Sequence, residues 1–90
     1  IVGESFTIVG DGSMGTACAL LLARIPDAQV TLWCQFEENA RAMSAERENR
    51  AYLPGVRIPD EVRIETDFAS CAAADAFVFA VPMMYLTKTV

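Results

Sequence analysis

The chain has 90 residues, of which 53% are hydrophobic, and its net charge is −5. An acidic chain without a basic cluster lacks the positive surface that nucleic acids and anionic membranes require, so we expect neither as a partner. The sequence contains no histidine, which excludes a histidine-dependent zinc site or catalytic triad within this segment.

The first half of the chain alternates between strand and helix patterns. Residues 5–10 form a short apolar run rich in β-branched and aromatic side chains, which predicts a buried strand. A helix is expected from Met14 to residue 25, because apolar residues recur there at helical spacing and Pro26 then ends the pattern. Residues 29–34 predict a second strand. Residues 36–50 are polar and helix-favouring.

The second half continues the same alternation. Residues 51–67 carry two prolines and a glycine and are predicted to be largely loop, with room for a short strand at 62–65. Residues 68–75 predict a short helix of small residues. Residues 76–81 form a continuous apolar strand, which Pro82 ends, and a new helix is expected after it. This order predicts an α/β fold, a Rossmann-type open parallel sheet with helices on both faces, truncated at residue 90.

Three glycines at G-x-G-x-x-G spacing join the first strand to the first helix. In a dinucleotide-binding turn, Gly10 lets the chain turn, Gly12 lets the backbone approach the diphosphate, and Gly15 lets the helix pack closely on the strand. The helix N-terminus then offers free N–H groups to the phosphates. The alternatives are a tight turn that binds no ligand and a methyltransferase-type glycine loop.

The end of the second strand bears on the adenosine side of such a cofactor. An acidic residue there would favour a free ribose and an arginine would favour a 2′-phosphate, but the chain has Gln35 and Phe36. Gln35 can hydrogen-bond a ribose, and Phe36 can lie against the adenine or pack as a core or helix-staple residue. Arg41, a turn into the next helix, either reaches a 2′-phosphate or is solvated.

The cysteines and the lack of targeting patterns indicate the cellular compartment of the protein. The three cysteines, Cys18, Cys34 and Cys71, are widely spaced and lie in apolar contexts, so we interpret them as free thiols and expect neither disulfides nor a metal site. No apolar stretch reaches the length of a membrane span, and no signal-peptide pattern is visible. We therefore expect a cytoplasmic protein.

Four segments together resemble one family. "GDGSMGTACA", "VTLWCQFEEN", "NRAYLPGVRIPDEVRIETD" and "ADAFVFAVP" are similar to the N-terminal domain of NAD(P)-dependent sn-glycerol-3-phosphate dehydrogenases. The resemblance covers nearly the whole chain. Its most specific part is the Tyr-Leu-Pro-Gly loop followed by "IPDEVRIETD", which other Rossmann dehydrogenases have no reason to carry.

The resemblance implies a set of cofactor-binding positions. The phosphate loop of the family falls on residues 10–15, with Ser13 and Met14 over the cofactor. The adenine-side residue falls on Gln35 or Phe36, and an aromatic contact falls on Tyr85, for which simple packing is the alternative. The expected cofactor-binding residues are therefore Gly10, Asp11, Gly12, Ser13, Met14, Gly15, Gln35, Phe36 and Tyr85.

Two positions depart from the family pattern. The family usually has a large aromatic residue at the position of Met14, and methionine can cover the same apolar area. It usually has a small neutral residue at the position of Asp11. A carboxylate beside a diphosphate costs affinity unless it points to solvent or caps the helix.

The resemblance also implies a reaction and a domain organisation. Residues 1–90 are expected to be the N-terminal part of a dinucleotide-binding domain, with the substrate domain and the catalytic residues, including a lysine, beyond residue 90. The whole enzyme would use NAD or NADP to transfer a hydride between the nicotinamide and glycerol 3-phosphate or dihydroxyacetone phosphate, supplying glycerol 3-phosphate for phospholipid synthesis. We expect a homodimer at full length. The alternatives are another Rossmann dehydrogenase, acting on a hydroxy acid or sugar nucleotide, and a non-catalytic NAD(H) sensor.

Overall fold

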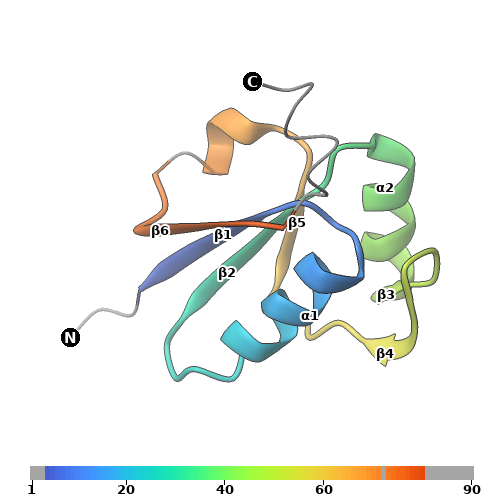
Figure 1. The fold of residues 1–90 in the computed structure, drawn as a ribbon, viewed down its shortest axis with the longest axis horizontal. Helices are drawn as coiled ribbons and strands as arrows, with labels where there is room; N and C mark the ends of the chain where they lie inside the picture. The colour runs from blue at the N-terminus through green and yellow to red at the C-terminus, as the bar shows by residue number, and fades with distance from the viewer. Residues whose placement is uncertain (1–3, 72, 81–90) are drawn as a thin grey trace.

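A computed structural model of the chain describes residues 4–71 and 73–80 (Figure 1). The elements in chain order are β1 (Ser5–Val9), α1 (Ser13–Leu22), β2 (Gln29–Trp33), α2 (Glu37–Glu46), β3 (Glu48–Asn49), β4 (Leu53–Arg57), β5 (Arg63–Glu65), the 3-10 helix η1 (Phe68–Cys71) and β6 (Ala76–Phe79).

Four of the described strands form one parallel sheet in the order β5-β2-β1-β6. β1 lies in the middle, where Thr7 is opposite Thr31 of β2 on one side and Phe77 of β6 on the other. Because all four strands run the same way, their carboxyl ends meet at one edge of the sheet, where ligands of such sheets bind. The predicted parallel α/β sheet is confirmed.

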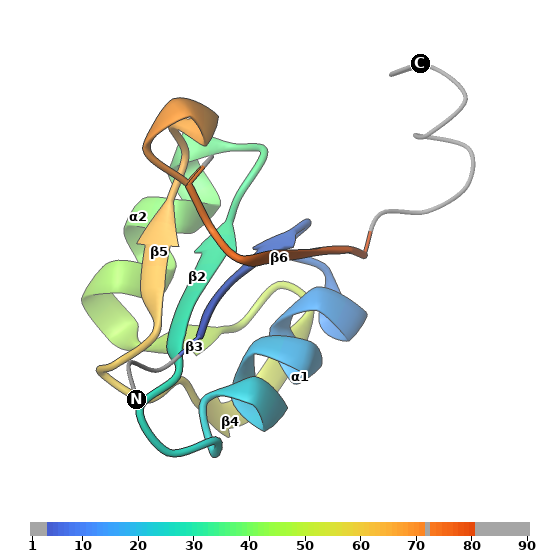
Figure 2. The same cartoon turned by 90° about the vertical axis from the view of Figure 1, so that its left-hand side faces the viewer.

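One face of the sheet carries the hydrophobic core. Ile8 of β1 and Val30 and Leu32 of β2, which alternate with residues of the other face, are buried here. Both α-helices cover it, since Ala19 of α1 and Met43 of α2 belong to the same cluster (Figure 2). The buried cluster comprises Ile8, Ala19, Val30, Leu32, Cys34, Ala40, Met43, Ile58 and Val62.

The opposite face of the sheet is covered in the described residues only by η1. Phe68 of η1 makes an edge contact with Trp33, with ring centroids 6.0 Å apart, and lies beside Phe77. Phe79 continues this aromatic row and is 65% exposed. Helical structure therefore lies on both faces, as predicted, but the second face has a 3-10 helix that ends at Cys71, shorter than the predicted helix over 68–75. The helix expected after Pro82 lies outside the described residues.

The segment over residues 51–67, predicted to be largely loop, contains β5 where a short strand was expected at 62–65, but it also contains β4, which was not expected. β4 pairs antiparallel with β3 in a separate two-stranded sheet, with Asn49 opposite Leu53 and Glu48 opposite Arg57. Pro54 and Gly55 lie between these paired positions, in an edge strand where a missing N–H or an unusual φ is tolerated. The prediction was wrong here because it relied on proline and glycine as breakers.

Arg47 ends α2 earlier than the predicted boundary at residue 50. Its backbone is left-handed, with φ 54°, which stops the helix at Glu46. Its guanidinium donates hydrogen bonds to the carbonyl oxygens of Ile58, Pro59 and Val62. The main chain closes the same junction, since the N–H of Ile58 donates to the carbonyl of Arg47 at 2.7 Å. Arg47 thus joins the two ends of the segment that carries β3 and β4.

Candidate functional site

The glycine loop begins where β1 reaches the carboxyl edge of the sheet. Gly10 has φ 119°, a conformation that side-chain-bearing residues rarely adopt, and this turns the chain out of the strand. The N–H of Gly10 still donates to the carbonyl of Trp33 at 3.1 Å, which ties the start of the loop to the end of β2. The task predicted for the first glycine is thus visible in the backbone.

Gly15 lies against the backbone of the same turn. A Cβ at this position would lie 1.9 Å from the carbonyl oxygen of Gly10 and 2.9 Å from its carbonyl carbon. It would also be 3.4 Å from the Cβ of Ala80, just after β6. The third glycine is therefore required by the close approach of α1 to the end of β1.

Gly12 differs from Gly15 because no contact with the described part of the chain requires it to be glycine. A Cβ there would meet no heavy atom within 4 Å, and its φ of −69° is open to any residue. The first hydrogen bond of α1 runs from the N–H of Thr16 to the carbonyl of Gly12 at 3.0 Å. Within residues 4–71 and 73–80, the amides of Gly12, Ser13 and Met14 have no acceptor. Open space beside free amides at a helix N-terminus suits a diphosphate.

The side chain of Asp11 neither points to solvent nor caps the helix, contrary to both geometries considered from the sequence. Asp11 is only 8% exposed, and the residue at the helix cap is Gly12. Its carboxylate accepts a hydrogen bond from Nδ2 of Asn39, in the first turn of α2, at 2.6 Å. The carboxylate of Asp11, which was expected to weaken diphosphate binding, is thus hydrogen-bonded to a side chain of α2.

Two further polar residues hold this loop, and the sequence reasoning missed both. Asn49 of β3 is completely buried, and its Nδ2 donates to the carbonyl oxygen of Asp11 at 2.7 Å. The same Nδ2 donates to the hydroxyl of Thr16 in α1 at 2.8 Å. The sequence offered little signal, because Asn49 stands three residues before the Tyr-Leu-Pro-Gly loop and opens a turn, closed by the N–H of Tyr52 on its carbonyl at 3.3 Å, for which asparagine is an ordinary choice.

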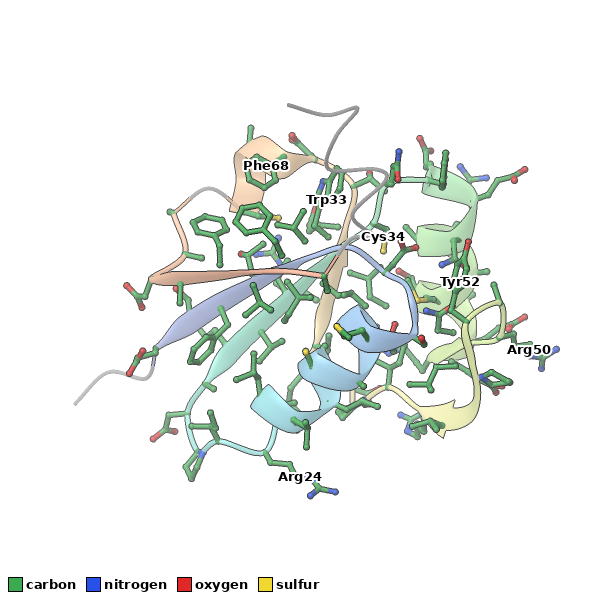
Figure 3. All side chains as sticks on the ribbon, viewed as in Figure 1. Arg24, Trp33, Cys34, Arg50, Tyr52 and Phe68 are labelled. Carbon is green, nitrogen blue, oxygen red and sulfur yellow. The ribbon has the colours of Figure 1, made fainter. Side chains whose placement is uncertain are left out.

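Cys34 lies at the end of β2 and faces the glycine loop (Figure 3). Burial raises the pKa of this thiol far above its ordinary range, and the negative charge of Asp11 and a hydrogen bond to that carboxylate raise it further. The thiol is therefore neutral and unreactive in the folded protein. All three cysteines are free, as predicted.

The raised pKa of Cys34 predicts a loss of stability in alkali. In the unfolded chain a thiol ionises with an ordinary pKa of about 8.5, whereas in the folded chain it stays protonated. The contribution of Cys34 to the free energy of unfolding should therefore be constant below this pH and should fall above it, by up to about 1.4 kcal/mol per pH unit. Cys34→Ser keeps a hydrogen-bonding group that does not titrate here and should flatten this slope.

Urea unfolding of the wild type and Cys34→Ser at pH 7.5, 9 and 10 measures the difference. Part of the slope should remain in the variant, because burial also raises the pKa of Cys71. Equal slopes for the two proteins would mean that Cys34 ionises in the folded state as it does in the unfolded chain.

The two residues that follow Cys34 are exposed to solvent near the glycine loop. Phe36 is 62% exposed, which rules out the core alternative and leaves its ring free for an adenine. Gln35 is exposed as well. Arg41 pairs with Glu37 at 2.8 Å on the surface of α2, so its charge is already partly neutralised.

The structure thus brings most of the predicted positions to one edge of the sheet. Gly10, Asp11, Gly12 and Gly15 form the turn, and Ser13 and Met14 follow it with exposed side chains, Met14 being 70% exposed. Gln35 and Phe36 follow Cys34, which contacts Asp11. Tyr85 lies outside the described residues.

Two findings concern other kinds of site in the described part of the chain. No group of three or more cysteine, aspartate, glutamate or histidine side chains could hold a metal ion there. None of its helices has the length and apolar character that crossing a membrane demands.

The parallel sheet, the glycine turn and the open N-terminus of α1 define the dinucleotide-binding domain of a Rossmann-type dehydrogenase. Comparison with known proteins identifies the family of dehydrogenases to which this domain belongs. Residues 5–90 match the family model described as the N-terminus of NAD-dependent glycerol-3-phosphate dehydrogenase, and the chain belongs to this family. The family is NAD(P)-dependent.

Individual relatives agree with the family match. The chain is 48% identical over 84 residues to glycerol-3-phosphate dehydrogenase [NAD(P)+] of Chlorobium limicola, and 46% identical over 84 residues to that of Chlorobium phaeobacteroides. Each alignment covers 92% of this chain and 25% of the relative. The chain therefore spans about a quarter of the length of these relatives.

Solved structures share the fold. The crystal structure of glycerol-3-phosphate dehydrogenase from Coxiella burnetii superposes with a TM-score of 0.80 at 34% identity, over 89% of this chain and 25% of that one. The enzyme from Plasmodium falciparum gives a TM-score of 0.83 at 25% identity, over 98% of this chain and 27% of that one. The predicted family is confirmed.

Proposed function

We propose that this chain binds the adenosine diphosphate part of NAD or NADP for a glycerol-3-phosphate dehydrogenase. The observation that carries the proposal is the space at Gly12, which the described residues leave open, beside the amides of Gly12, Ser13 and Met14, for which those residues provide no acceptor. Protein contacts explain Gly15, whereas an approaching ligand is what explains Gly12. Family membership supports the same function.

Each residue of the proposed site has a physical role. Gly10 and Gly15 shape the turn, and the amides that follow it meet the negative diphosphate together with the positive end of the α1 dipole. Met14 offers apolar area over the cofactor. Gln35 and Phe36 are placed for the ribose and the adenine, and Tyr85 completes the expected set. Asp11 contributes through its backbone, since its carboxylate is held by Asn39.

When bound, the nicotinamide supplies the hydride chemistry, between its ring and glycerol 3-phosphate or dihydroxyacetone phosphate. This chain binds and orients the cofactor. The residues that contact the substrate, including the lysine implied by the family resemblance, belong to the substrate domain beyond residue 90. We further propose that the whole enzyme is a cytoplasmic homodimer that supplies glycerol 3-phosphate for phospholipid synthesis.

The test uses the full-length protein, with dihydroxyacetone phosphate as substrate and either NADH or NADPH as reductant. Oxidation of the reduced cofactor that depends on dihydroxyacetone phosphate is expected, and the ratio of the two rates gives the cofactor preference. Binding of NADH without turnover would point to the sensor alternative or to another substrate. Failure to bind either cofactor would overturn the proposal.

A further inference from the structure

We propose that Asn49 and Thr16 are positioning residues of the glycine loop, which they hold so that the amide of Gly12 faces the cofactor diphosphate. The inference rests on the cofactor binding proposed above and adds residues that contact no cofactor atom themselves. It also gives a function to β3, which lies outside the parallel sheet.

The hydrogen bonds of these two side chains converge on one backbone atom. Nδ2 of Asn49 uses both of its hydrogens, donating to the carbonyl oxygen of Asp11 at 2.7 Å and to Oγ1 of Thr16 at 2.8 Å. The hydroxyl of Thr16 in turn donates to the same Asp11 carbonyl at 3.3 Å. Both side chains are at most 1% exposed, so water does not compete for these bonds.

Fixing the carbonyl of Asp11 also fixes the amide of Gly12. The peptide bond between them is planar and trans, so its C=O and its N–H point in opposite directions and rotate together. With the oxygen held toward the interior, the N–H of Gly12 must point outward, where it has no acceptor among the described residues. A diphosphate then meets a donor that needs no reorientation on binding.

The side chain that imposes this arrangement is itself firmly placed. Asn49 belongs to β3, which pairs with β4, and Arg47 just before it joins the base of this pair to residues 58–62. A second amide, that of Asn39, lies 3.5 Å from Oδ1 of Asn49 and 2.6 Å from the Asp11 carboxylate. α2 and β3 therefore brace the glycine loop from the side away from the cofactor.

A purely structural role is the competing explanation, because buried polar groups need partners whatever the function. The two explanations differ in one measurable respect. Loss of a structural hydrogen bond lowers the melting temperature but leaves the cofactor affinity of the folded protein unchanged. Loss of a positioning bond lowers the affinity even where the variant is fully folded.

The experiment measures the dissociation constant for NADH in the full-length protein by fluorescence titration, well below the melting temperature. Thr16→Val keeps the shape of the side chain and removes the hydroxyl, and it should weaken NADH binding about fivefold, the equivalent of one neutral hydrogen bond. Asn49→Asp replaces the donor by an acceptor and should weaken binding by about tenfold or more. Thr16→Ser keeps the hydroxyl and should restore most of the affinity. The KM for NADH should rise in the two impaired variants while the KM for dihydroxyacetone phosphate stays unchanged.

Val30→Ala is the matched control, because it removes buried volume near the amino end of β2, at the edge of the sheet away from the glycine loop. It should lower the melting temperature and leave NADH affinity as in the wild type. The inference is overturned if Thr16→Val loses stability but binds NADH like the wild type, and this variant decides the matter even if Asn49→Asp fails to fold. A wild-type protein that binds neither NADH nor NADPH would instead refute the proposed function.

Discussion

Replacing Gly12 by valine is expected to weaken NADH binding about 100-fold and to leave the fold intact. Across residues 4–71 and 73–80 no heavy atom lies within 4 Å of the place that the added Cβ would take, and the backbone conformation suits valine. The new side chain occupies the space through which a diphosphate reaches the amides of Gly12 and Ser13. Losing two hydrogen bonds to a charged group costs about 3 kcal/mol, which corresponds to the expected loss of affinity.

The measurement is a titration of the full-length variant with NADH, alongside its melting temperature. A small loss of stability, about 1 kcal/mol, is expected because valine is a poorer helix cap than glycine. The control is Ala51→Val, which adds the same kind of side chain at an exposed position between β3 and β4. Wild-type affinity in Gly12→Val would show that the diphosphate does not lie at this loop.

Replacing Gly15 by alanine should instead act mainly on stability and cause a large decrease in the free energy of unfolding. The added carbon would lie 1.9 Å from the carbonyl oxygen of Gly10, and a backbone atom in a hydrogen-bonded turn has little room to move. Overpacking typically costs about 1–3 kcal/mol, and contact with backbone places this variant at or above the upper end. The better helix propensity of alanine returns at most about 1 kcal/mol.

Urea unfolding followed by circular dichroism measures this loss, with Gly12→Ala as the control. Both variants make the same chemical change within one loop, but only the Gly15 site lacks space for the carbon. Gly12→Ala should therefore lose only about 1 kcal/mol, for the poorer helix cap, while Gly15→Ala unfolds at a much lower urea concentration. Similar midpoints for the two variants would mean that α1 can move away from β1 without penalty.

The parallel sheet was predictable from the sequence because its evidence is local. β1, β2 and β6 lie in short apolar runs separated by helical patterns or turns, and only the edge strand β5, Arg63–Glu65, carries a weak pattern. β3 and β4 were not predictable in this way, since two paired positions in β3 give no periodicity and Pro54 and Gly55 suggest a break. The segment that carries them is closed by Arg47, whose contacts with residues 58–62 no local pattern reveals.

The candidate site shows the same difference between features with local evidence in the sequence and features that depend on long-range contacts. The glycines could be assigned because turning, close packing and open approach are requirements of single positions. The surroundings of Asp11 could not, because its partners Asn39 and Asn49 lie 28 and 38 residues away. A long-range polar network leaves no spacing in the sequence from which it could be inferred.

The contacts of Arg47 fix the two ends of the segment that carries β3 and β4, whereas the turn between the two strands can vary in length. Its two ends are held together by side-chain and main-chain bonds between residue 47 and residues 58–62, independently of what lies between them. Lengthening a closed loop is inexpensive, at about 0.6 kcal/mol for each doubling. Insertions at the turn over residues 50–52 should therefore be tolerated by the sheet and the helices. Asn49, two residues after Arg47, would keep its place beside the glycine loop through such changes.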